Sequence, residues 1–139
     1  MNIDSIKRGI VIDHIHAGRS MDIYKYLRLD ELECSVAIIK NVKSSLMGRK
    51  DIIKIDDNIS VDLDVLGYID PDVTINIIED GHIVEKKHIA LPEKLVNVIR
   101  CKNPRCITSV EQELPHVFRL TDRERHEYRC LYCETQAGK

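Results

Sequence analysis

Four cysteines near the C-terminal end of the chain have the residue type and the spacing of a metal centre. Cys101 and Cys106 form a C-x4-C pair, and Cys130 and Cys133 form a C-x2-C pair after a gap of 23 residues. Two short loops that each supply two thiolates can surround one tetrahedral ion, and zinc prefers such ligands in closed four-coordinate sites. Four thiolates leave no open position for water or substrate. The pattern therefore predicts one structural zinc per chain and argues against a catalytic metal.

The alternative to a metal site is a set of disulfides. The chain has five cysteines, an odd number, and the residues after Met1 mix polar, charged and apolar types without an apolar secretory leader. We therefore expect a cytoplasmic protein, whose thiols stay reduced. The fifth cysteine, Cys34, starts the apolar run 34–39 and is expected to be a small buried hydrophobe.

Length and composition fit an aliphatic α+β domain followed by a small metal-stabilised one. The chain has 139 residues, of which 43% are hydrophobic and only 4% aromatic, with one Phe and no Trp. Such a core must be built from Ile, Val and Leu, and β-branched side chains favour sheet. The net charge of −2 does not indicate a nucleic-acid partner. No segment approaches the ~20 apolar residues of a membrane span.

Hydrophobic periodicity and turn signals predict the elements that must position these residues. Strands are expected at 6–15, 34–42, 51–55, 73–78 and 82–89, and helices at 21–29 and 60–69 with Ser20 and Ser60 as N-caps. Residues 43–50 are expected to form a polar loop, and Asp80-Gly81 is a strong hairpin signal. Further short strands are expected at 117–120 and 127–129.

The order β-α-β-β-α-β-β favours a particular α+β fold. We expect a ferredoxin-like sandwich, in which two helices cover one face of an antiparallel sheet, followed by a small all-β zinc-binding domain. The expected domains are 1–92 and 93–139, joined through a connector at 91–93.

No set of residues in the chain has the pattern of a catalytic site. There is no glycine-rich phosphate loop, nucleophile elbow or H-E-x-x-H motif. Asp13 and His14 are adjacent, and neighbours on a strand point to opposite faces, so they are not expected to form an acid–base pair. Most of the six histidines are expected to be ordinary surface residues. Lys54 and Lys86 could meet at the polar face of the sheet and bind a polyphosphate, but spacing alone favours ordinary solvated lysines.

Several ordered segments resemble one protein family along nearly the whole chain. The matching segments are 6–9, 11–15, 47–51, 53–55, 74–76 with Ile78, 91–93, and the four cysteines. Together they resemble the regulatory chain of aspartate carbamoyltransferase, the aspartate transcarbamoylase of de novo pyrimidine biosynthesis. One departure is Gly81, where the best-known member has a tyrosine, so the hairpin offers no ring beside a bound base.

The resemblance implies an allosteric regulatory subunit with no catalysis of its own. Its N-terminal domain would bind CTP and UTP, which inhibit, and ATP, which activates. Its zinc domain would contact the catalytic chain, and regulatory dimers would bridge catalytic trimers. No membrane and no nucleic acid are expected among the partners.

The resemblance also implies which residues bind the nucleotide. Asp13 and His14 would line the pocket, the backbone of Ile6 would meet the base, and Lys54 would lie near the ribose and base. Lys86 would hold the phosphates with help from Asn76 and His14. The full implied set is Asp4, Ile6, Asp13, His14, Lys50, Lys54, Asn76, Ile78, Ile83 and Lys86.

Two other functions compete with this one. One is a zinc-ribbon nucleic-acid binder, which is suggested by four arginines: Arg119, Arg123, Arg125 and Arg129. Acidic residues around them argue against a phosphate-binding stripe: Glu111, Glu113, Asp122, Glu124 and Glu127. A small-molecule enzyme on a ferredoxin-like scaffold is the second alternative. The absence of a convergent nucleophile or base in the sequence argues against it.

Overall fold

The structure, a computed structural model, describes residues 6–137, and the chain divides into two compact units, Met1–Ala90 and Leu91–Lys139. The first unit follows the predicted order of strands and helices, with one additional 3-10 helix. Its elements are β1 (Gly9–His16), α1 (Ser20–Tyr26), η1 (Leu29–Glu31), β2 (Val36–Ser44), β3 (Gly48–Ile55), α2 (Leu63–Ile69), β4 (Thr74–Glu79) and β5 (His82–His88). No helix in the described part of the chain is long and apolar enough to cross a membrane.

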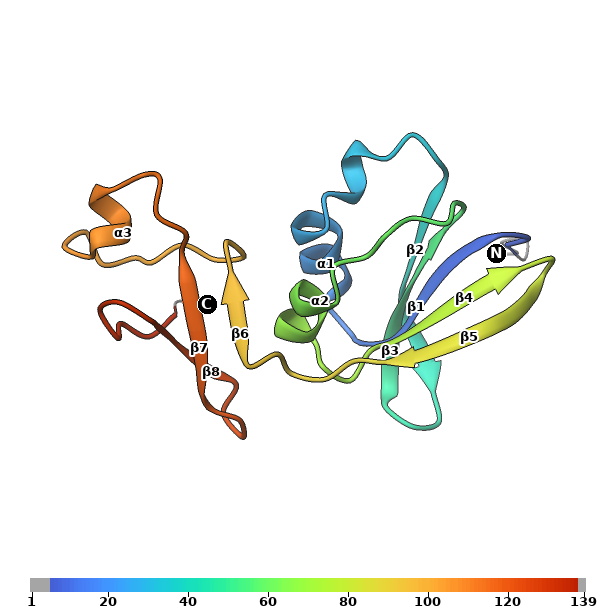
Figure 1. Ribbon diagram of the computed structural model, residues 1–139. Coiled ribbons are helices and arrows are strands. Elements are labelled where there is room, and N and C mark those ends of the chain that lie inside the picture. Colours follow the sequence, from blue (N-terminus) through green and yellow to red (C-terminus); the bar gives the residue numbers. More distant parts are fainter. Residues whose placement is uncertain (1–5, 138–139) are drawn as a thin grey trace. The chain divides into compact units, whose positions relative to one another are not determined.

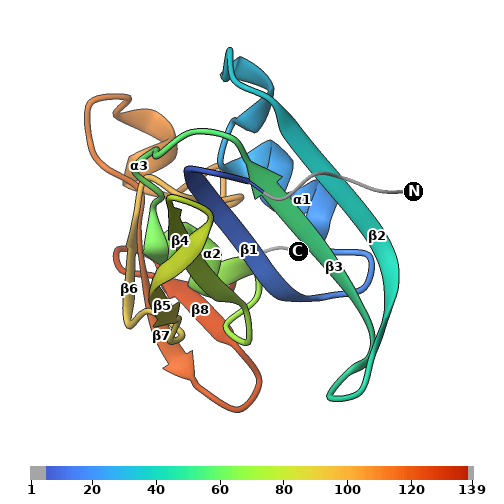
Figure 2. The ribbon, with the colours of Figure 1, turned by 90° about the vertical axis from the view of Figure 1, so that its right-hand side faces the viewer.

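The five strands of the first unit form one antiparallel sheet in the order β2-β3-β1-β4-β5 (Figure 2). Both α-helices lie on the same face of this sheet (Figure 1). Ile12, Ile53 and Ile55 are fully buried and form the core with the helices. Because successive side chains of a strand alternate between faces, the residues between them belong to the opposite face, which we call the outer face. The predicted α+β fold class is confirmed.

The helices begin and end differently from the prediction. α1 ends at Tyr26, and Ser20 is its buried first residue instead of its cap. The amide of Ser20 has another acceptor, because Oδ2 of Asp51 lies 3.3 Å away. α2 begins at Leu63 and not at Ser60. Its N-cap is Asp62, whose Oδ1 accepts hydrogen bonds from the amides of the first turn.

The predicted polar loop at 43–50 is wrong. β2 continues to Ser44 and β3 starts at Gly48, so only three residues connect the two strands. The hydroxyl of Ser44 accepts a hydrogen bond from the Met47 amide at 3.1 Å, and Gly48 has a φ of +77°. The strand residues 43–44 and 49–50 are polar because this end of the strand pair is largely exposed, so their polarity did not mark the end of the two strands.

The hairpin between β4 and β5 contains one irregularity that sets its register. Asp80 and Gly81 have φ values of +51° and +76°, the positive angles that a type I′ turn needs. Ile78 pairs with Ile83, whereas Ile77 pairs with Glu85, so Val84 is an extra residue in β5. This bulge places Lys86 opposite Asn76.

The second unit is a small three-stranded antiparallel sheet. It contains β6 (Lys94–Val96), α3 (Ile107–Val110), β7 (Val117–Asp122) and β8 (Glu127–Cys130), with the strand order β6-β7-β8. Its core is formed by Leu95, Phe118 and Tyr128, each about fully buried. The single-turn helix α3 was not predicted, because four residues are too few to show a helical period.

Candidate functional site

The four cysteines of the predicted metal site lie together in the second unit. Their Sγ atoms all lie within 4.8 Å of one another. Cys101 is 3.5 Å from Cys133, and Cys106 is 3.7 Å from Cys130, measured between sulfurs. A disulfide would need about 2.05 Å, whereas a tetrahedral ion with metal–sulfur bonds of about 2.3 Å separates its sulfurs by about 3.8 Å. The cluster therefore fits a single tetrahedral metal ion.

Tight backbone turns hold two of these cysteines. The Cys106 carbonyl accepts a hydrogen bond from the Ser109 amide at 2.9 Å, and the Cys130 carbonyl accepts one from the Glu134 amide at 2.9 Å. Each cysteine thus stands at the start of a short turn, which aims its thiol inward. The unit would fold around the ion, because so small a core is rarely stable alone.

Two threonine hydroxyls support the thiolate form of the cysteines. Thr108 Oγ1 lies 3.0 Å from Cys106 Sγ, and Thr135 Oγ1 lies 3.1 Å from Cys133 Sγ. These contacts lower the pKa of Cys106 and lower the pKa of Cys133 to about 6. Burial acts in the opposite direction on Cys101 and raises its pKa to about 12. A bound cation would remove this penalty, because it stabilises all the thiolates at once.

The structure brings several predicted nucleotide residues together on the outer face of the first unit. The cross-strand pairs place Lys54, Val11, Asn76 and Lys86 in one row across β3, β1, β4 and β5. Three strand spacings of about 4.8 Å separate the two lysine backbones by about 14 Å. The lysines therefore do not meet, as their sequence positions suggested they could. They flank Asn76 from opposite sides.

The polar groups of this row have no partners among residues 6–137. Asn76 is 8% exposed, and its Oδ1 has no hydrogen-bond partner. Within the same residues, the amines of Lys54 and Lys86 take part in no hydrogen bond or ion pair. A buried acceptor without a donor is unfavourable unless a ligand or water satisfies it. The row therefore has the composition of a site for an anionic ligand that also carries donors.

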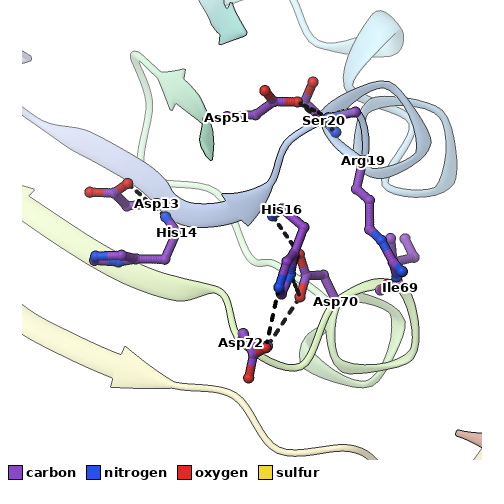
Figure 3. Close-up of polar contacts among 10 residues, drawn as sticks. Asp13, His14, His16, Arg19, Ser20, Asp51, Ile69, Asp70 and Asp72 are labelled. Carbon is purple, nitrogen blue, oxygen red and sulfur yellow. Dashed lines mark hydrogen bonds and ion pairs between the residues drawn. The ribbon is translucent and has the colours of Figure 1, made fainter. Parts of the chain in front are cut away.

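The prediction that Asp13 and His14 face opposite sides is wrong. Ile12 pairs with Ile53 and Ile15 with Asp51, so β1 has an extra residue at this point, and His14 has a φ of +58°. The bulge cancels the alternation. The Asp13 carboxylate accepts a hydrogen bond from the His14 amide at 2.6 Å (Figure 3).

Other contacts keep both side chains at the outer face. Lys50 Nζ lies 3.0 Å from the Asp13 carboxylate, and His14 Nδ1 lies 3.0 Å from Thr74 Oγ1. Burial alone would raise the pKa of Asp13, but the hydrogen bonds from Lys50 and His14 and the charge of Lys50 together outweigh it and lower the pKa. Asp13 and Lys50 are thus neutralised by each other. Thr74 was missed by the sequence prediction, because a threonine on a strand carries no signal of its own.

The remaining predicted residues divide into three groups. Ile78 and Ile83 form a pair at the end of the outer face next to the turn. Ile6 precedes β1, and the neighbouring Lys7 carbonyl accepts a hydrogen bond from the Gly81 amide at 2.9 Å. The segment before β1 and the β4–β5 turn therefore adjoin, as a shared base-binding site would require. Asp4 lies outside the described residues.

Two further sequence expectations concern Cys34, in the first unit, and the four arginines of the second unit. Cys34 is half-buried and not fully buried as predicted. The four arginines each have a carboxylate within 4.0 Å, with N···O distances of 3.4 to 3.9 Å. Because their charges are balanced locally, they do not form the free basic stripe that a phosphate backbone attracts.

The fold and the two sites define a class of protein: a metal-binding protein whose first unit is an antiparallel α+β sandwich. Comparison with known proteins identifies both parts. Residues 1–90 match the allosteric domain of the aspartate carbamoyltransferase regulatory chain, and residues 93–139 match its metal binding domain. The chain therefore belongs to the family of aspartate carbamoyltransferase regulatory chains.

Individual relatives support the same assignment over nearly the full length. The aspartate carbamoyltransferase regulatory chain of Clostridium tetani is 58% identical over 135 residues, which cover 96% of this chain and 94% of the relative. The one from Clostridium botulinum strain Hall is 54% identical, with 96% and 92% covered. The one from Bifidobacterium longum is 46% identical, with 99% of each covered. This chain is thus a non-catalytic, regulatory subunit in pyrimidine biosynthesis, with an allosteric and a metal-binding domain.

Proposed function

We propose that the outer face of the first unit binds nucleoside triphosphates, with CTP and UTP as inhibitors and ATP as activator of the catalytic chain. The observation that carries this proposal is the row formed by Lys54, Asn76 and Lys86, in which two cations without a partner among residues 6–137 flank a buried amide whose oxygen has none there either. A triphosphate nucleotide supplies both anionic oxygens and hydrogen-bond donors. It is also long enough to extend between lysines whose backbones are about 14 Å apart.

The family resemblance implies the roles of the residues, and their places on the sheet support these roles. Lys86, on the exposed edge strand β5, would hold the phosphates, and Lys54, on β3, would lie near the ribose and base. Asn76 would serve as the central hydrogen-bonding group. His14 would assist the phosphates from the bulge, where Thr74 fixes its ring. Backbone groups of Ile6 and of the Asp80-Gly81 turn would meet the base, since the two segments adjoin.

Calorimetry on one variant and one matched control tests this site. Lys86→Ala should weaken CTP and ATP binding by about tenfold or more, since hydrogen bonds to charged groups contribute ~1.5–3 kcal/mol. Lys87→Ala is the control, because Lys87 pairs with the buried Ile75 and so lies on the helix side of the sheet. If Lys86→Ala bound CTP and ATP with the same affinities as the wild type does, the assignment would be refuted.

We further propose that the metal of the second unit is zinc, one per chain, and that this unit binds the catalytic chain. Cys101, Cys106, Cys130 and Cys133 are the ligands in this proposal. Zinc is favoured because four thiolates in tetrahedral arrangement are its preferred structural ligands. The regulatory chains would pair as dimers that bridge catalytic trimers in the cytoplasm, where the thiols stay reduced.

Regulation by this arrangement requires that the nucleotide bind two states of the assembly with different affinities. Couplings of this kind are typically ~1–3 kcal/mol, so the effect on aspartate saturation would be a shift of the midpoint and not an on/off switch. CTP and ATP would oppose each other by favouring different states from the same face.

A further inference from the structure

A second group of metal-ligating side chains lies at the end of β1 in the first unit, away from the four cysteines. It consists of His16, the last residue of β1, and Asp70 and Asp72 in the segment between α2 and β4 (Figure 3). Their candidate ligand atoms lie within 4.8 Å of one another. Neither the candidate nucleotide site nor the thiolate centre uses any of these three residues.

Asp70 is the buried member of this group and is fully engaged. Its side chain is 1% exposed, and its Oδ2 accepts hydrogen bonds from the His16 amide at 2.7 Å and from His16 Nδ1 at 2.8 Å. Its Oδ1 accepts a hydrogen bond from the Asp72 amide at 3.2 Å. Asp70 thus fixes both the backbone of His16 and the orientation of its ring.

The contact with Asp70 determines which ring nitrogen of His16 carries a proton. A carboxylate only accepts hydrogen bonds, so Nδ1 must be the donor. In the neutral ring, Nε2 then bears the free lone pair, and it faces Oδ2 of Asp72 at 3.6 Å. Two electron-pair donors therefore face each other, and a cation between them would relieve the repulsion.

The separation of these two atoms fits a metal ion better than a shared proton. A hydrogen bond between a ring nitrogen and a carboxylate is about 2.7–2.9 Å long, well below the observed 3.6 Å. Two ligands at about 2.1 Å from a tetrahedral ion are about 3.4 Å apart. A carboxylate on the far nitrogen of a ligating histidine is also the usual outer-shell arrangement of metal sites.

We propose that His16 Nε2 and Asp72 Oδ2 form a second, exchangeable site for a divalent transition cation of the zinc class, with Asp70 as the carboxylate that orients the ring. Water would complete the coordination, since His16 and Asp72 are both exposed. The ion would be held less tightly than one bound by four thiolates. The ion would link the end of β1 to the segment just before β4, and its ligand His16 lies two residues after His14.

Calorimetry with zinc ions alone, on the full chain, tests the site. Elemental analysis first counts the ions that the purified chain already holds, so that a failure of the thiolate assignment is seen separately. Added zinc should then bind as a further, weaker equivalent. In NMR spectra of the histidine rings, the same titration should shift His16.

Single substitutions identify the ligands. His16→Gln and Asp72→Asn should each weaken the further equivalent by at least about tenfold, and Asp70→Asn should do so by about 10–100-fold through the loss of ring orientation. Asp72 is 71% exposed, so its variant keeps the fold even if Asp70→Asn does not. His126→Asn is the control, an exposed histidine in the second unit that should leave the titration unchanged. Absence of a further equivalent, or its survival in both His16→Gln and Asp72→Asn, would overturn the proposal.

Discussion

At the scale of single residues, Asp51 shows how one carboxylate organises the sheet. Its side chain is fully buried on the helix side of β3. Oδ2 accepts a hydrogen bond from the Gly18 amide at 3.0 Å, and Oδ1 accepts one from the Asn41 amide at 2.8 Å. Asn41, with a φ of +60°, belongs to a bulge in β2 directly beside Asp51. One buried charge thus ties the β1–α1 corner to the neighbouring strand.

Asp51→Asn should lower the free energy of unfolding of the first unit by about 1–3 kcal/mol, because the backbone amides lose a charged acceptor. Burial would raise the pKa of Asp51, but the hydrogen bonds from Ser20 and from the amides of Asn41 and Gly18 together lower it below its ordinary value of 3.8. The unfolded chain therefore binds the proton more readily. The contribution of Asp51 is present above the ordinary pKa and is lost as the pH falls through the folded-state value.

Urea unfolding of the wild type and of Asp51→Asn, followed by helix signal as a function of pH, measures this contribution. The difference between the two proteins should be largest near neutral pH and should shrink as the pH falls below about 4. Metal loss at low pH affects both proteins alike and cancels in the difference. A difference that stays constant down to the acid limit would contradict the role given to the ionised carboxylate.

At the scale of elements, the β4–β5 turn depends on one glycine. A Cβ at Gly81 would meet no atom within 4 Å, so space is not limiting there. The backbone conformation is limiting, because φ is +76° and residues other than Gly lose about 1–2 kcal/mol in this conformation. In this chain, with this turn geometry, a larger residue at position 81 is therefore disfavoured by backbone conformation and not by lack of space.

Gly81→Ala should destabilise the first unit by about 1–2 kcal/mol, and Gly81→Asn should do so by less, because asparagine tolerates positive φ. Thermal unfolding monitored by circular dichroism would rank the three proteins. If alanine and asparagine were equally harmful, side-chain volume and not backbone conformation would be the cause.

The sequence predicted the elements of the first unit better than their irregularities. Alternating isoleucines in β1 and β3 located the strands, because burial of one face enforces a period of two. Bulges insert one residue and leave no trace in composition, so the shared side of Asp13 and His14 could not be foreseen. The polar ends of β2 and β3 were missed because exposed strand residues lack the apolar alternation that marks a strand. Neither Thr74 nor the His16–Asp72 pair was predicted, since both depend on contacts between segments that are distant in sequence.

At the scale of the whole molecule, the cysteine spacing alone indicated a separate metal-stabilised unit. Removal of the ion should unfold the second unit and leave the first folded, because the core isoleucines of the first unit involve no metal ligand. Cys130→Ser should therefore abolish binding to a catalytic aspartate carbamoyltransferase trimer but retain CTP binding.

Sedimentation of the purified chain mixed with the trimer, together with CTP calorimetry, distinguishes these two activities. Lys87→Ala serves as a surface control that should assemble normally. A Cys130→Ser chain that forms full-size complexes without metal would disprove the role of the ion in docking. A variant that loses CTP binding as well would show that the two units do not fold independently.

The extra residue in β5 has a consequence for charge. Val84 shifts the strand by one position, so that Asn76 lies opposite Lys86 and not opposite Glu85. If the bulge were absent and Val84 paired with Ile77, every following residue of β5 would shift by one position, its side chain would turn to the other side of the sheet, and Glu85 would lie opposite Asn76. A negative group would then stand beside the orphaned amide oxygen, and the surface would repel the anions that it now attracts.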